Sequence, residues 1–124
     1  MSTINELSYK IIGCAFTVHS TLGPGLLESA YEPCLSHELI KQGLRVERQV
    51  PMPLVYDGID ISVAYRADLI VESSIIVELK AIEKLLPLHD AQLLTYMRIT
   101  GLSLGLLLNF NVRDMKQGIR RLIL

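Results

Sequence analysis

The sequence predicts an α/β (α+β) fold with the element order ααβββαβ, in which helices flank one mixed central sheet. Three observations predict it. Apolar residues recur at helical spacing near the N-terminus, extended segments joined by tight turns follow, and an almost wholly apolar run comes after a third helical segment. Half of the 124 residues are hydrophobic and a fifth are charged, as is typical of a globular protein with one core. We therefore expect residues 1–124 to form a single domain.

The first two elements are expected to be helices. In residues 4–22 the apolar side chains recur every three or four positions, and Gly23-Pro24-Gly25 ends the pattern. A second helix is expected over residues 26–42, with Gly43 as its C-terminal signal. Pro33 lies inside this segment and is expected to kink it, because a proline there removes one backbone hydrogen bond.

An antiparallel meander of three strands is expected next. Residues 45–56 contain two prolines and are typical of an edge strand. Asp57-Gly58 is a strong signal for a two-residue hairpin turn, which joins that strand to residues 59–71. Residues 75–80 complete the meander.

The C-terminal part is expected to return to the sheet after one more helix. This helix is predicted over residues 91–100, behind a helix-opening segment at 87–90. Residues 104–110 are almost wholly apolar, which indicates a strand buried on both faces. The segment beyond Gly118 predicts one further short strand.

Charged residues interrupt two strands that are otherwise apolar enough to be buried. A buried carboxylate costs several kcal/mol unless a metal or a counter-charge compensates it, so Asp68, Glu78 and Lys80 indicate a metal site. Glu78 and Lys80 share a face because side chains alternate along a strand. A three-residue loop at 72–74 places Asp68 opposite Glu78, with Cβ atoms about 5 Å apart. A two-residue loop would put them on opposite faces, and an exposed face with scattered charges is the simpler alternative.

Four other polar residues fall on helix faces expected to point inward. Glu28 lies on the apolar stripe of the second helix, although a carboxylate in a first turn is also stabilised by the helix dipole. Gln92 and Tyr96 are one turn apart on the third helix, where Tyr96 could equally be a core tyrosine with Gln92 as its partner. His19 ends the first helix, where a hydrogen-bonded terminal histidine is the more common situation.

The net charge of −1 does not by itself indicate a nucleic-acid-binding protein, but its distribution is uneven. Residues 1–79 carry five Lys and Arg against ten Asp and Glu, and residues 80–124 carry seven against three. This asymmetry fits an acidic metal site beside a basic phosphate-binding rim, and it fits an ordinary solvated surface equally well.

A cytoplasmic location is the default expectation. The N-terminus has no secretory signal, and residues 99–112 form too short an uncharged stretch to cross a bilayer. Cys14 and Cys34 are expected to be free thiols in a reducing compartment, with a disulfide left open.

These residues together resemble a known family. Gly25-Leu-Leu-Glu28-Ser-Ala-Tyr31 matches the motif of the GxxExxY family of small prokaryotic proteins. Asp68, followed by Glu78-Leu79-Lys80 and by Gln92-Leu-Leu-Thr-Tyr96, is similar to the PD-(D/E)XK nuclease superfamily, in the branch with a QxxxY helix. The resemblance covers nearly the whole chain and implies a restriction-endonuclease-like core. Ala67 stands where the proline of the motif would be.

The resemblance implies a metal-dependent nuclease that hydrolyses phosphodiester bonds, most often in DNA. Its catalytic residues would be Asp68, Glu78 and Lys80. Asp68, Glu78 and the Leu79 carbonyl would bind Mg²⁺ or Mn²⁺, with Glu28 in the outer shell, and Gln92, Tyr96 and His19 would support the site. The alternatives are an RNA-directed nuclease and a catalytically weak or inactive nucleic-acid- or protein-binding module. A homodimer, which would double a small contact surface, is compatible with the sequence, and no membrane partner is expected.

Overall fold

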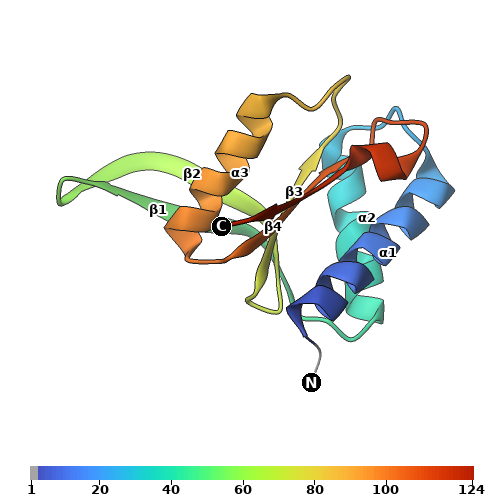
Figure 1. The fold of residues 1–124 in the computed structure, drawn as a ribbon, viewed down its shortest axis with the longest axis horizontal. Helices are drawn as coiled ribbons and strands as arrows, with labels where there is room; N and C mark the ends of the chain where they lie inside the picture. The colour runs from blue at the N-terminus through green and yellow to red at the C-terminus, as the bar shows by residue number, and fades with distance from the viewer. Residues whose placement is uncertain (1–2) are drawn as a thin grey trace.

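The computed structural model describes residues 3–124, apart from the side chains of residues 63 and 64. Figure 1 shows helices on both sides of one twisted sheet. The elements are α1 (Ile4–Leu22), α2 (Glu28–Lys41), β1 (Val46–Tyr56), β2 (Ile59–Val71), β3 (Ile75–Lys80), α3 (Pro87–Thr100), β4 (Leu104–Asn109), the 3₁₀ turn η1 (Met115–Gly118) and β5 (Ile119–Ile123). The expected order ααβββαβ and the expected C-terminal strand are confirmed.

The sheet has five strands in the order β1-β2-β3-β4-β5. Only β3 and β4 run parallel, and the other neighbouring pairs are antiparallel, so the sheet is mixed as expected. The single parallel pair arises because α3 crosses over between β3 and β4, whereas tight turns or short loops connect the antiparallel strands. Every residue of β4 is buried, which confirms the prediction from its apolar run.

The two faces of the sheet carry separate apolar cores. The α1 and α2 helices cover one face and pack against Leu79 and Leu106, together with Phe110 beyond β4. The other face is covered by α3, whose residues Leu93 and Met97 lie in a second core. Helix and strand therefore meet on both sides, and alternate residues of β3 point to different helices.

The outer part of the β1–β2 hairpin projects from the body of the protein as an arm (Figure 1). Asp57 and Gly58 form its two-residue turn with φ of 51° and 74°, the left-handed values that this turn requires. Val55, Tyr56 and Ile59 near the tip are exposed. The arm therefore carries apolar side chains into solvent.

The β2–β3 loop has the length on which the predicted site depends. Val71 pairs with Ile75 across a three-residue loop, and the amide of Ser74 donates to the Val71 carbonyl at 3.0 Å. Glu72 and Ser73 adopt φ of 52°, which lets the chain reverse over these residues. The register Leu69–Val77 brings Asp68 opposite Glu78 at the next position, and this confirms the three-residue alternative.

Close packing at Gly105 and hydrogen bonds from Asn109 fix the elements around Asp68 and Glu78. A Cβ on Gly105 of β4 would lie 2.7 Å from Met97 Sδ, so α3 sits directly on that strand. The Asn109 side chain accepts from the Ile82 amide at 3.1 Å and donates to the Ile82 carbonyl at 3.0 Å. Asn109 thus ties the end of β4 to the segment after Lys80, which defines where β3 ends.

Two further expectations bear on the environment of the protein. Both cysteines are free thiols, with Cys14 buried and Cys34 partly buried. Among the helices in residues 3–124, none combines the length and the apolar character that a bilayer crossing needs.

Candidate functional site

Asp68 and Glu78 are joined by two reciprocal hydrogen bonds between main chain and side chain. The Asp68 amide donates to Glu78 Oε1 at 3.0 Å, and the Leu79 amide donates to Asp68 Oδ2 at 2.9 Å. Each carboxylate therefore satisfies a backbone donor on the neighbouring strand, at the point where the regular β2–β3 ladder stops. This exchange fixes the orientation of both carboxylates before any ligand binds.

The environment of Glu78 favours its neutral form. Glu78 is only 5% exposed. Burial raises its pKa from an ordinary value of 4.5 to about 8, with a further contribution from the negative charge of Asp68, while the Asp68 amide and Lys80 act in the opposite direction. Glu78 is therefore largely protonated at neutral pH in the metal-free protein, and a cation bound between the two carboxylates would favour its ionised form.

Three of the predicted site residues line one groove on the α3 side of the sheet. Lys80, Gln92 and Tyr96 lie in a cavity of about 550 Å³ whose other lining residues are Leu54, Tyr65, Leu88, His89, Thr95 and Ile99. Gln92 Nε2 donates to the Tyr96 hydroxyl at 3.0 Å. Burial raises the Tyr96 pKa, and the charge of Glu78 raises it further, so the phenol stays protonated beside the carboxylates. Asp68 and Glu78 do not line this groove, but Lys80 follows Glu78 by two residues on the same face of β3, so the groove lies next to the pair.

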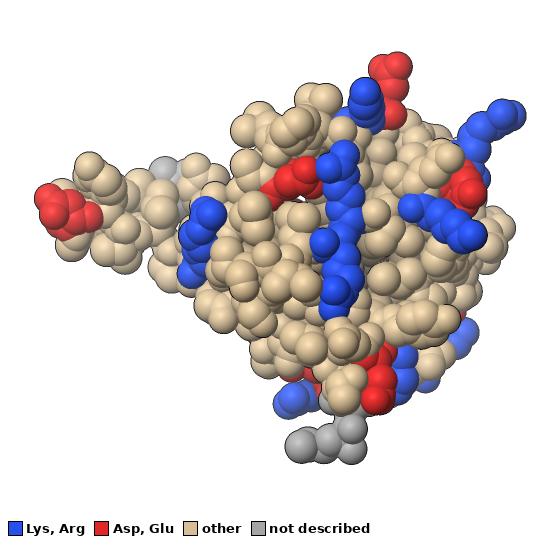
Figure 2. Space-filling model, viewed as in Figure 1, with Lys and Arg blue, Asp and Glu red and all other residues tan. Residues whose placement is uncertain are grey.

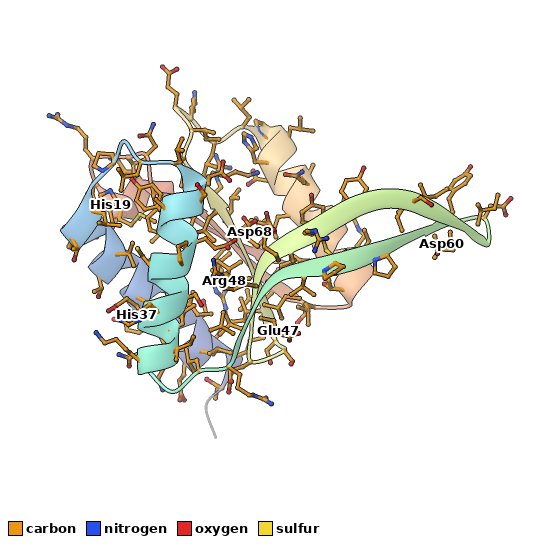
Figure 3. The ribbon with its side chains drawn as sticks, turned by 180° about the vertical axis from the view of Figure 1, so that it is seen from behind. His19, His37, Glu47, Arg48, Asp60 and Asp68 are labelled. Atoms are coloured by element: carbon orange, nitrogen blue, oxygen red, sulfur yellow. The ribbon has the colours of Figure 1, made fainter. Side chains whose placement is uncertain are left out.

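Glu28 and His19 are placed differently. Glu28 is the first residue of α2 and is exposed to solvent. His19 is buried at the end of α1, where its Nε2 is 2.7 Å from the Val112 carbonyl oxygen. Figure 3 shows His19 on α1, separated from Asp68 by α2. His19 thus connects α1 to the segment after β4, and the supporting roles predicted for both residues remain predictions.

A polar network that the sequence did not predict lies on the α2 side of Asp68. Gln49 Nε2 donates to Asp68 Oδ1 at 3.3 Å and also to Glu32 Oε1. The Arg48 guanidinium donates to Glu32 Oε2 from Nε at 3.3 Å and from Nη2 at 3.1 Å. Figure 3 shows Arg48 between α2 and the β1–β2 hairpin. A buried carboxylate on α2 is therefore linked to Asp68 through one glutamine.

A weak sequence signal for Glu32 does exist. Glu32 follows Glu28 by one helical turn, so the two carboxylates lie on the same side of α2. Only Glu32 is buried, at 9% exposed, and it borders the apolar residues Tyr31 and Leu35. Tyr31 itself is a core residue, since its ring stacks on Phe110 with centroids 4.6 Å apart and its hydroxyl donates to the Gly23 carbonyl.

The donor atoms at this site suit a hard divalent cation. Carboxylate oxygens of Asp68 and Glu78 and a backbone carbonyl form the kind of ligand set that Mg²⁺ and Mn²⁺ prefer. Within residues 3–124, no group of three His, Cys, Asp or Glu side chains is assembled around one point. Mg²⁺ commonly uses one or two carboxylates together with waters and substrate phosphates, so two carboxylates are enough.

Two carboxylates joined by hydrogen bonds, with a lysine two residues further along the strand, lie in a mixed sheet covered by helices on both faces. This combination defines the class of protein. A family model described as the PD-(D/E)XK nuclease superfamily matches residues 5–122. The chain belongs to the PD-(D/E)XK nuclease superfamily. Searches of curated proteins and of solved structures gave no match.

Proposed function

We propose that this protein is a metal-dependent nuclease that hydrolyses phosphodiester bonds in DNA, in the GxxExxY branch of its superfamily. The reciprocal hydrogen bonds between Asp68 and Glu78, beside the Lys80-lined groove, are the observation that carries this proposal. They hold two oxygen ligands in a fixed arrangement, and Lys80 ends the strand that carries Glu78. Superfamily membership supports the proposal, because divalent metals are typical of these nucleases.

Each residue has a role that follows from its chemistry. Asp68, Glu78 and the Leu79 carbonyl would hold Mg²⁺ or Mn²⁺, and Glu28 would contact its outer shell. When bound, such a cation activates water and neutralises negative charge on a phosphate. Lys80 binds a phosphate oxygen as a point charge with three donors. The Gln92–Tyr96 pair orients its free hydrogen-bonding groups toward the substrate backbone in the same groove.

The test is DNA cleavage by the purified protein with Mg²⁺ or Mn²⁺, compared between Lys80→Ala and Lys84→Ala. Lys84 is an exposed lysine four residues further along the chain, outside the groove, and its variant controls for the loss of one positive charge. We expect metal-dependent cleavage that Lys80→Ala abolishes and Lys84→Ala retains. Equal activity of Lys80→Ala and wild type would refute the assigned role of Lys80.

A binding module on the nuclease scaffold is the alternative. It predicts metal or nucleic-acid binding without cleavage under any of these conditions. The near-neutral net charge of −1 favours it, together with Lys80 as the one Lys or Arg among the described residues that line the groove. Cleavage by the wild-type protein that is lost in Lys80→Ala would exclude this alternative.

A further inference from the structure

The residues that line the groove beside the Asp68–Glu78 pair are mainly apolar, which is unusual for a site that binds phosphates. Leu54 and Tyr65 belong to the projecting β1–β2 arm, and Leu88 and Ile99 belong to α3. Lys80 is the one Lys or Arg among the described lining residues, and that lining contains neither Asp nor Glu. One positive charge thus lies beside a mainly apolar surface.

Tyr65 provides a flat aromatic surface in this groove. Its ring packs at an angle of 57° on Tyr96, with centroids 6.2 Å apart, and Tyr96 is buried. Tyr65 keeps 37% of its surface exposed, so its ring is supported from one side and accessible from another. Leu88 is 75% exposed across the groove, on the helix wall. Leu88, Tyr65 and Lys80 line the same groove. Together they suit a flat, partly apolar group that carries a phosphate.

The size and lining of the groove suit an unpaired base better than a paired one. A base in a double helix has both faces covered by its neighbours, whereas an unpaired base can stack on an aromatic side chain. A cavity of about 550 Å³ is in the range of small-ligand sites and is too small to admit a double helix. A duplex would contact only the rim, since the arm projects beyond the body on that side (Figure 1).

We infer that the groove binds single-stranded DNA, with one unpaired base stacked on Tyr65 and the adjoining phosphate at Lys80. This inference rests on the proposed function and narrows its substrate class to single strands and unpaired ends. The pairing of one lysine with an aromatic and apolar surface supports a nucleotide over an acidic peptide, because a nucleotide combines a phosphate with a flat base. Figure 2 also shows a column of Lys and Arg side chains on one face of the molecule.

The test is fluorescence anisotropy with a short labelled DNA strand, free or annealed to its complement, in buffer with EDTA so that no cleavage occurs. Wild type is compared with Tyr65→Ala, Tyr65→Phe and Tyr56→Ala. Tyr56 is 73% exposed near the arm tip and lies outside the groove lining, so its variant controls for the loss of a surface tyrosine. Thermal unfolding of each variant checks the fold.

We expect wild type to bind the free strand more tightly than the duplex. Base–aromatic stacking contributes about 1–3 kcal/mol per base, so Tyr65→Ala should weaken strand binding by at least about fivefold. Tyr65→Phe should retain the affinity because stacking needs the ring and not the hydroxyl, and Tyr56→Ala should bind as wild type. Duplex binding should be the same in all four proteins.

A second variant keeps the inference testable if Tyr65→Ala does not fold. Leu88→Glu places a carboxylate on the exposed wall of the groove and should weaken strand binding, whereas Ile40→Glu, at a residue 59% exposed on α2, should not. Equal affinity for strand and duplex, or equal binding by Tyr65→Ala and Tyr56→Ala, would overturn the inference. Binding of neither DNA form would also overturn it and would favour a protein partner. Because EDTA separates binding from catalysis, strand binding without any cleavage in Mg²⁺ would refute the proposed function alone.

Discussion

Replacement of Glu78 by Gln is expected to stabilise the metal-free protein at neutral and alkaline pH. The Glu78 carboxyl is buried among apolar neighbours and lies beside Asp68, so the folded protein favours its protonated form. A glutamine has nearly the same shape, can accept the same hydrogen bond from the Asp68 amide, and carries no charge at any pH. The substitution therefore removes the ionisation and keeps the packing.

The sign and size of the effect follow from the pKa of Glu78. In the unfolded chain this pKa has its ordinary value of 4.5, and in the folded protein it rises to about 8. The folded state therefore binds more protons than the unfolded state between these pH values. The contribution of Glu78 to stability is complete below pH 4.5 and is lost as the pH rises to about 8. The full difference is about 5 kcal/mol, and about 3 kcal/mol of it is already lost at pH 7.

The assay is thermal unfolding of wild type and Glu78→Gln from acid to alkaline pH in metal-free buffer. The two should unfold at similar temperatures near pH 4.5 and diverge as the pH rises, until the variant unfolds roughly 10 °C higher at pH 7. Glu83→Gln, at an exposed carboxylate, should follow wild type throughout. Added Mn²⁺ should stabilise wild type by binding its folded state and should leave Glu78→Gln unchanged. Parallel pH profiles of wild type and Glu78→Gln would refute the argument.

Three further substitutions test the site and its frame. Asp68→Asn keeps an acceptor for the Leu79 amide but should abolish Mn²⁺ binding in calorimetry. The control Asp60→Asn, at the exposed arm tip, should bind Mn²⁺ as wild type does. Unchanged Mn²⁺ affinity in Asp68→Asn would show that Asp68 is not a metal ligand. Gln49→Ala should weaken Mn²⁺ binding roughly tenfold, because Asp68 loses a hydrogen-bond partner that orients its carboxylate. The melting temperature should change little, and the control Gln42→Ala should bind Mn²⁺ as wild type does. Unaltered Mn²⁺ affinity in Gln49→Ala would contradict this role. Gly118→Ala should lower the free energy of unfolding in urea by about 2–4 kcal/mol, because its Cβ would clash with the Asn109 carbonyl. Gly13→Ala, with open space on an exposed helix face, should raise it by up to about 1 kcal/mol. A change of the same sign in both variants would refute this contrast.

The sequence narrowed the β2–β3 part of the site to two registers, one for a three-residue loop at 72–74 and one for a two-residue loop. Only the three-residue loop gives the register with Asp68 opposite Glu78, because a one-residue slip moves every side chain to the other face. The structure has that register, with Val71 opposite Ile75. Helical spacing places His89, Gln92, Tyr96 and Ile99 on one face of α3, and all four line the groove.

The β1 contribution could not be predicted because it depends on an irregularity in the hairpin. The two-residue turn pairs Tyr56 with Ile59, and a regular ladder from that turn would place Glu47 opposite Asp68. A register shift between Met52 and Leu54 moves β1 by two residues, so that Gln49 lies opposite Asp68. Prolines in this segment indicate that pairing is disturbed there, but not by how many residues. Because of this bulge, the amide donor Gln49 lies beside Asp68 in place of the carboxylate Glu47.

Asp68 lies on the middle of three adjacent strands, with Gln49 on one side and Glu78 on the other, and local rules are broken at both neighbouring positions. Gln49 has φ of 52° inside a strand, and Glu78 is a buried carboxylate whose charge the surroundings oppose. Either feature costs stability, and neither is needed to form the sheet. Both contact Asp68, because Gln49 donates to Oδ1 of its carboxylate and the Glu78 carboxylate accepts from its amide. The Leu79 amide donates to the other carboxylate oxygen, Oδ2. Local rules that fail on both sides of one side chain point to a functional site at Asp68. A divalent cation bound by Asp68 and Glu78 would offset the buried charge of Glu78, which the protein alone opposes.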